Sequence, residues 1–249
     1  MSAKKYFLFT LLLIASFLIQ AQNPVGAIPG VIDVSPMGAA TYTIPIEVVP
    51  GTQGVQPNLS VVYNSFGGMG LLGMKWNLSG LSAITRCTQL PYYDDWNISE
   101  IQFNENDRFS LDGNRLLKLN SGIYGSIEGI YATEMEDFTR IISYGGALGC
   151  PNYFKAYIDD GFIIEYGNSD NSKQKLGDSN NSIIRWNINK ITDSNGNHMT
   201  FHYGLFNSEI WIDSIRYSGN GFVPFAKVVF RYIELSDTMG KNTSVMSIE

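Results

Sequence analysis

Apolar and polar residues alternate with a period of two along much of this chain. The first clear case is Thr41–Val49, in which Tyr42, Ile44 and Ile46 would all point to one face of a half-buried strand. Pro45 interrupts this run and has no N–H to donate to a β-ladder. We therefore expect the strand to lie at a sheet edge or to carry a bulge.

Similar short runs continue as far as residue 233 and are separated by turn residues. The further predicted strands are 58–64, 75–86, 108–111, 115–119, 138–144, 154–158, 162–166, 183–191, 198–203, 210–217 and 226–233. Asx-Gly pairs at 112–113, 160–161 and 195–196 predict tight hairpins, because these residues accept positive φ angles. The pattern predicts an all-β fold in which antiparallel hairpins form a large curved sheet or a partial shell.

Three segments are predicted to lie outside the strands. Asn23–Ala40 is rich in Gly, Pro and Ala and is typical of an extended lead-in, whereas Asn168–Ser182 is a polar surface loop. Phe66–Gly73 is dense in glycine, which suits positive φ or close backbone approach at a sheet corner. It is not a phosphate-binding loop, because Lys75 is followed by Trp76 and a strand pattern instead of a helix.

Composition supports an ordered, β-rich chain. Of the 249 residues, 44% are hydrophobic, and Tyr and Phe together supply 28 residues beside 25 Gly. This length suits one large β domain or two small ones. The net charge of −6 has no basic stripe to offset it, which argues against binding to nucleic acid or to an anionic membrane.

The first 21 residues have the three-part layout of a secretory signal peptide. Lys4 and Lys5 precede an apolar run, Tyr6–Ile19, and Ala21 offers a small residue at the cleavage point. The alternative is a membrane anchor, but the run is shorter than the ~20 residues of a span. We expect a signal peptide over 1–21, a lead-in over 22–40 and a β-rich module over 41–249, secreted with no membrane span after cleavage.

Cys87 and Cys150 are the only cysteines. In an exported chain they could form a disulfide, but two buried thiols are an equally good interpretation. The sequence leaves this choice open.

Candidate chemistry is sparse, and we predict no catalytic, cofactor-binding or metal site. His198 and His202 would share a helix face, but their segment alternates like a strand, in which four residues span ~13 Å. We expect two exposed strand residues. Asp193–Asn197 resembles the start of a calcium loop but lacks the EF-hand spacing of Gly and Glu, so a hairpin turn is expected.

Paired carboxylates and tryptophans have structural interpretations too. Asp94-Asp95 and Asp159-Asp160 are neighbours that would point to opposite faces of a strand, so neither pair makes an acid/base dyad, and both suit surface turns. The tryptophans could line a glycan-binding face, but such residues more often fill a β core. They are Trp76, Trp96, Trp186 and Trp211.

Several motifs, taken in order and spacing, carry a family resemblance. They are Gly38–Gly51, Gln56–Ser65 and Gly70–Arg86, followed by Asp107–Leu117 and Arg185–His198. In this arrangement the chain resembles the SpvB family, the N-terminal region of toxin-complex B components and of related Rhs proteins with YD repeats. The likeness covers most of residues 37–240.

The resemblance implies a non-catalytic structural module that contributes to a β shell around a C-terminal effector. It implies as partners downstream Rhs/YD-repeat segments of the same polypeptide or a second toxin subunit. ADP-ribosyl transfer in a relative would belong to a region that has no counterpart here. The last predicted strand leaves an open edge, so we expect further strands to follow Glu249. The alternatives are a secreted glycan- or surface-binding module and, least favoured, a hydrolase with dispersed carboxylates.

Overall fold

The computed structural model describes residues 29–70, 72–176, 182–206, 209–220, 223–236 and 242–248. The predicted signal peptide therefore lies outside the described residues, as does the first part of the lead-in. The described chain is all-β, with two short 3₁₀ turns, η1 (Thr52–Gly54) and η2 (Asp170–Ser172). All its strand pairings are antiparallel, as the hairpin pattern predicted.

The N-terminal strands form a small four-stranded sheet. Its order is β1 (Val31–Val34), β2 (Ala40–Ile46), β3 (Leu59–Asn64) and β6 (Trp76–Ser79). β1 lies within the segment predicted as a lead-in, so that prediction missed a strand. β1 pairs only with residues 40–43 of β2, and Pro45 lies beyond this pairing, opposite Ser60 of β3. Pro45 thus occupies an edge portion of the strand, as expected.

The glycine-dense loop folds into a two-strand hairpin, β4 (Met69–Gly70) and β5 (Gly73–Met74). Gly73 adopts a φ of +104°. A side chain at Gly70 would collide with the backbone of Trp76. Positive φ and close approach are therefore both used here, which confirms the structural interpretation of this loop.

Eight strands close into a barrel. They are β7 (Ala83–Cys87), β8 (Arg108–Leu111), β9 (Asn114–Lys118), β10 (Ile130–Thr133), β11 (Arg140–Tyr144), β12 (Tyr153–Tyr157), β13 (Ile163–Tyr166) and β15 (Ile183–Thr192). Each of the strands from β7 to β13 pairs with the next, and β15 closes the ring. It pairs with β13 through Ile164↔Ile191 and with β7 through Ile84↔Trp186. A curved sheet or partial shell was expected, whereas these strands form a closed barrel.

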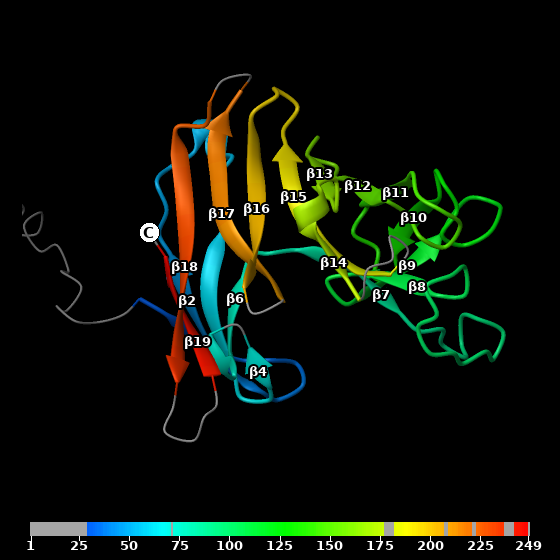
Figure 1. The fold of residues 1–249 in the computed structure, drawn as a ribbon, viewed down its shortest axis with the longest axis horizontal. Coiled ribbons are helices and arrows are strands. Elements are labelled where there is room, and N and C mark those ends of the chain that lie inside the picture. The colour runs from blue at the N-terminus through cyan, green and yellow to red at the C-terminus, as the bar shows by residue number, and fades with distance from the viewer. Residues whose placement is uncertain are drawn as a thin grey trace, which may run out of the picture.

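β15 is shared by the barrel and by the sheet that continues beyond it. Its C-terminal half pairs on one side with β13 of the barrel and on the other with β16 (His198–Phe206). From there the sheet continues through β17 (Glu209–Gly219), β18 (Ala226–Ser236) and β19 (Asn242–Ile248). In Figure 1 the barrel lies on one side of β15, and β16–β18 stand side by side on the other. The small sheet packs on this long sheet, where Val55 and Leu59 join its buried side chains.

Aromatic side chains fill the barrel. The ring of Phe109 meets those of Tyr131, Phe154 and Trp186 edge-on, with centroids 5.2–6.2 Å apart. All four side chains are fully buried. Edge-to-face contacts of this kind stabilise a core beyond the burial of apolar area. The barrel interior is therefore a packed core.

The tight turns confirm the prediction from Asx-Gly pairs. Asp112 and Gly113 have φ angles of +47° and +86°, and Gly161 and Gly196 are also positive. The polar segment 168–182 was predicted to be a surface loop, but its described part has secondary structure. It contains η2 and a short strand, β14 (Lys173–Lys175), which pairs with the N-terminal half of β15. Ser172 of η2 and Lys173 of β14 are both buried there.

Candidate interaction site

Residues 90–98, which we call the aromatic loop, present apolar side chains to solvent. Tyr92 and Trp96 are each 86% exposed and Ile98 is 78% exposed. Tyr92 and Trp96 line a shallow groove of about 530 Å³ together with Leu90 and Pro91. Exposed aromatic clusters on a soluble domain commonly mark a contact surface. The aromatic loop is therefore the main candidate for binding a partner.

A buried carboxylate holds the aromatic loop on the barrel. Asp94 accepts hydrogen bonds from the backbone N–H of Leu90 at 2.8 Å and from Nε of Arg108 at 2.6 Å, and it also pairs with Arg115. Its side chain is only 4% exposed. Asp94 lies in a turn, as predicted, but its side chain is buried instead of exposed, because it pairs with two arginines of β8 and β9. Asp95 is exposed, in agreement with the prediction.

The loop backbone is strained where it turns outward. Asp95 and Trp96 both adopt positive φ, at +52° and +63°. Non-glycine residues hold such angles only when the surroundings enforce them. The Tyr93 hydroxyl adds a further tie by donating to Glu134 at 2.5 Å, and this hydrogen bond raises the pKa of Tyr93. The aromatic loop is thus a constrained platform.

One end of the barrel is closed by an ion pair. Nη1 of Arg86 donates to Oδ2 of Asp107 at 2.9 Å, and neither side chain is exposed. Nε of Arg86 also donates to the carbonyl of Ile183, and Nη1 to that of Gly149, both at 3.0 Å. Three aromatic rings surround the guanidinium with centroids 5.3–5.5 Å away: Phe103, Phe109 and Trp186. These contacts give the pair a structural role.

Polar contacts tie the small sheet to the hairpin between β15 and β16. Oε1 of Gln53 accepts hydrogen bonds from the side-chain amides of Asn197, at 2.7 Å, and of Asn195, at 3.1 Å. The Tyr217 hydroxyl donates to the carbonyl of Val49 at 2.9 Å. Gln53 adopts a φ of +53° to make its contacts. The two sheets are therefore joined by specific hydrogen bonds as well as by their apolar faces.

The segment Asp193–Asn197 forms a hairpin turn, as predicted. Asp193 accepts hydrogen bonds from the backbone N–H groups of Asn195 and Asn197 at 2.9 and 2.8 Å. The side-chain amide of Asn197 also donates to Asp193, and this hydrogen bond is the main cause of a lowered Asp193 pKa. The Asp193 carboxylate therefore stabilises the turn.

Among the described strands, β1 and β19 are open sheet edges, and β6 is a third, since it pairs only with β3. β1 pairs there only with β2, and β19 only with β18. On β1, Val31, Ile32 and Val34 are 65%, 80% and 63% exposed. An edge strand with exposed apolar side chains can accept another strand. These edges are the second candidate interaction surface.

The histidines lie on strand β16, as predicted, but both are half-buried instead of exposed. The ring of His202 hydrogen-bonds to Thr200 at 3.1 Å, and that of His198 contacts the carbonyl of Gly196 at 3.3 Å. Within the described ranges, no three His, Cys, Asp or Glu side chains gather in a way that could hold a metal ion. No helix among the described residues is long and apolar enough to cross a bilayer.

Cys87 and Cys150 are thiols that form no disulfide with each other in this structure. Cys150 is buried and donates to the carbonyl of Phe103 at 3.0 Å, whereas Cys87 lies half-buried on β7. Burial raises the pKa of the Cys87 thiol. Of the two interpretations that the sequence left open, the structure shows the thiols.

Of the four tryptophans, Trp186 is fully buried, as the core interpretation predicted. Trp76 and Trp211 are half-buried and pack on Tyr63 and Tyr232. Trp96, on the aromatic loop, is exposed. The second acidic pair, Asp159-Asp160, is exposed next to the Gly161 turn, as expected.

Comparison with known proteins relates this chain to a protein family and to solved structures. The family model of the Salmonella virulence plasmid 65 kDa B protein, SpvB, matches residues 34–212. No curated protein sequence matches the chain.

Solved structures share the fold. The N-terminal domain of the effector protein SpvB from Salmonella typhimurium strain LT2 aligns with a TM-score of 0.58 and 17% identity, over 80% of this chain and 77% of that domain. A crystal structure of TcdB2–TccC3 aligns at 0.65 with 16% identity, over 86% of this chain and 12% of the other. The Photorhabdus luminescens Tc holotoxin pore aligns at 0.65 with 15% identity, over 90% and 12%. The chain therefore spans about an eighth of the length of these toxin-complex chains.

Proposed function

Because the chain belongs to the SpvB family, we propose that it is a non-catalytic structural module of a secreted toxin-complex-type protein. In this role it forms part of a β wall that encloses or delivers an effector carried by another segment or subunit. The observation that carries the proposal is the combination of a filled barrel with two sheets that each keep an open edge among the described strands, β1 in the small sheet and β19 in the long one. A filled barrel provides rigidity, whereas an open edge provides a place for continuation.

The grooves support a module without catalysis. Among the described residues that line them, the groove beside the aromatic loop has no carboxylate, and a second groove, beside β3 and β6, has only Asp112. Asp112 already accepts hydrogen bonds from the Ser82 hydroxyl at 2.6 Å and from the backbone N–H of Ala83 at 2.8 Å. Glycoside hydrolysis needs two carboxyl groups facing one another across a cleft. Neither groove offers that pair.

The partner we propose is a strand from a downstream Rhs/YD-repeat segment or from a second toxin subunit. It would add to the free edge of β1, where backbone groups are available and Ile32 and Val34 are exposed. Strand addition of this kind draws its affinity from main-chain hydrogen bonds and its specificity from alternate side chains. Export by the predicted signal peptide over residues 1–21 belongs to the same proposal.

Solution behaviour of residues 23–249 tests the open-edge proposal. We expect association that increases with concentration, measured by light scattering after gel filtration, and a marked reduction in Ile32→Lys/Val34→Lys. Lysine on an edge strand opposes pairing without disturbing a core. Met135→Lys is the matched control, because Met135 is 76% exposed and lies outside β1. A monodisperse, cooperatively melting monomer at all concentrations would contradict the proposal.

The aromatic loop favours a second candidate function, recognition of a glycan or a host surface. Tyr92 and Trp96 offer apolar faces around one groove, an arrangement that suits stacking against a sugar ring. Glycan-array binding that disappears in Trp96→Ala and persists in Phe138→Ala would support this function. Phe138 is 72% exposed and serves as the matched aromatic control. The absence of any glycan binding by the unmodified protein would leave the structural role alone.

A further inference from the structure

A polar pocket of about 340 Å³ opens between strand β14 and the loop that joins β11 to β12. Its polar lining includes Lys173 and Lys175 from β14, Asn152 from the loop and Asp170 from η2. The pocket lies apart from the aromatic loop and from the edge of β1. The proposed function makes no use of it.

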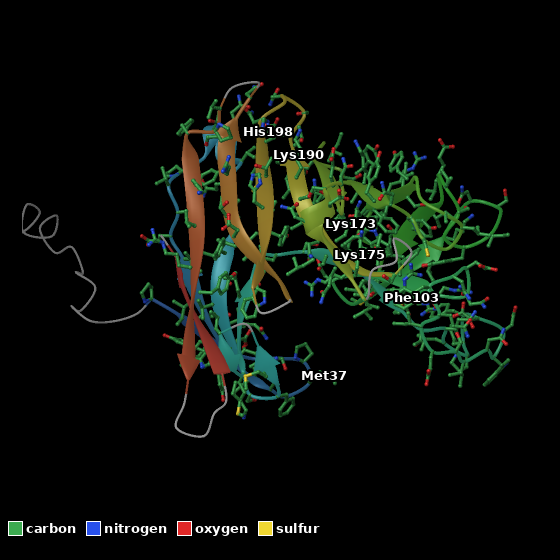
Figure 2. All side chains as sticks on the ribbon, in the orientation of Figure 1. Met37, Phe103, Lys173, Lys175, Lys190 and His198 are labelled. Atoms are coloured by element: carbon green, nitrogen blue, oxygen red, sulfur yellow. The ribbon has the colours of Figure 1, made fainter. Side chains whose placement is uncertain are left out.

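The two lysines reach the pocket from one face of β14. Residues two apart on a strand point the same way and lie ~7 Å apart along it. Lys173 lies opposite Trp186 and Lys175 opposite Ile183 on β15, with a register shift between Gln174 and Lys175. Both lysines nevertheless line the pocket. Figure 2 shows the two lysines close together, below Lys190 on the neighbouring strand. Two positive charges therefore converge on one small polar space.

The charge of Lys173 is poorly balanced within the protein. The side chain is 7% exposed, and its ammonium donates to Oδ1 of Asn152, a neutral oxygen, at 2.7 Å. Its carboxylate partner, Asp170, is 3.4 Å away and has a side chain that is 97% exposed. An ammonium has three N–H donors, so these contacts leave capacity for another acceptor.

Arg86 provides the comparison within the same chain. Its carboxylate partner, Asp107, is as fully buried as the guanidinium itself. A buried cation without an equally buried counter-charge carries a desolvation cost that a bound anion would offset. Among the described residues that line the pocket, there are two lysines and one aspartate.

We propose that this pocket binds a phosphate group. A phosphate carries close to two negative charges at neutral pH and several strong acceptor oxygens, which match two ammonium groups on one strand face. The volume suits a small phosphorylated ligand, and the polar lining does not suit an apolar one. Binding is reversible, with the ligand accepting hydrogen bonds from Lys173 and Lys175.

Calorimetric titration of the protein with inorganic phosphate, at constant ionic strength in a chloride buffer, tests the proposal. We expect saturable binding that weakens at least tenfold in Lys173→Gln and in Lys175→Gln. Lys227→Gln is the matched control, because Lys227 is exposed on β18 and its loss removes the same charge. Phosphate should also raise the melting temperature of the unmodified protein and of Lys227→Gln.

A second arm replaces inorganic phosphate with glycerol phosphate. Tighter binding of glycerol phosphate identifies a phosphate monoester as the natural class of ligand, and weaker binding identifies free phosphate. Because Lys173 is buried, its variant could lose the fold, in which case Lys175→Gln decides the outcome, since Lys175 is only half-buried. The proposal is overturned if the unmodified protein shows no saturable binding, or if Lys175→Gln binds phosphate as tightly as Lys227→Gln.

Discussion

Arg86 and Asp107 form an ion pair at 2.9 Å in which both side chains are completely shielded from solvent. Asp107 also accepts hydrogen bonds from the backbone N–H groups of Gln102 and Phe103, at 2.8 and 2.6 Å. The pair therefore links strand β7 to the loop that precedes β8. Since buried ion pairs add little net stability over apolar contacts, their importance lies in what happens when one partner is lost.

Replacing Arg86 by methionine is expected to destabilise the protein by about 3–5 kcal/mol, because it leaves the Asp107 carboxylate buried without a counter-charge. Chemical denaturation followed by circular dichroism measures this loss. Arg140→Met is the matched control, since Arg140 is exposed on β11, and it should change stability by less than about 0.5 kcal/mol. Equal effects of the two substitutions would show that the Arg86 pair has no special role.

Neighbouring aspartates on the aromatic loop make a second matched pair. Asp94→Asn removes the charge that holds Arg108 and Arg115, and we expect a loss of about 3 kcal/mol. Asp95→Asn should be close to neutral, because Asp95 is exposed and Asn tolerates its positive φ. Thermal unfolding of both variants checks the difference. A neutral Asp94→Asn would mean that the aromatic loop is not held by this carboxylate.

The sequence predicted the strands well because local alternation determines them. Arg108–Leu111 was predicted with the bounds that the structure has, and the turn at Asp112-Gly113 follows from positive φ. The predicted strands omit β1, β10, β14 and β19, and also the short β4 and β5. β1 and β14 illustrate why. β1 lies in a segment rich in Gly, Pro and Ala, and β14 is only three residues long, with two lysines. Neither run has the alternating apolar pattern that identifies a strand.

Closure of the barrel and the polar sites could not be predicted, because they depend on contacts between distant segments. The pairing of β13 with β15 spans η2 and β14, and no local pattern specifies it. Asp94 looks like an ordinary turn residue until folding brings it to Arg108 and Arg115. Side-chain charge is visible in a sequence, but burial beside a particular partner is a property of the tertiary fold.

Replacing a buried and an exposed tryptophan by alanine should have very different effects on stability. Trp186→Ala should cost about 3–5 kcal/mol, because it empties the centre of the barrel and removes edge contacts with Phe109 and Phe154. Trp96→Ala should change stability by less than about 1 kcal/mol, since its ring is 86% exposed. Urea titration of both variants measures the contrast. A large loss in Trp96→Ala would assign its ring a packing role in place of a recognition role.

The contact between the small sheet and the β15–β16 hairpin should be measurable as a coupling energy. Gln53→Ala removes the acceptor for Asn195 and Asn197 and should cost about 1 kcal/mol. In a double-mutant cycle with Asn197→Ala, we expect the two substitutions to couple by about 0.5–1 kcal/mol, because they remove the same hydrogen bond. Strict additivity in urea unfolding would show that the hydrogen bond between Gln53 and Asn197 does not help to join the two sheets.

His202 gives the fold a dependence on pH. Burial lowers the pKa of His202 below its ordinary value of 6.5, and Arg216 and Lys227 add to this effect while Asp213 opposes it. Protonation is therefore less favourable in the folded state than in the unfolded chain. The stabilising contribution is complete above pH 6.5 and is lost as the pH falls from there through the lowered pKa of the folded state.

The free energy of unfolding should accordingly decline between pH 7.5 and pH 5, measured by urea titration at each pH. Glu165 and Asp193, whose pKa values lie below their ordinary 4.5 and 3.8, add to the decline mainly below pH 5. His202→Gln should flatten the decline, whereas His198→Gln, which leaves His202 in place, should preserve it. If His202→Gln keeps the full decline, the pH dependence comes from another group, and the burial of the His202 ring is not its cause.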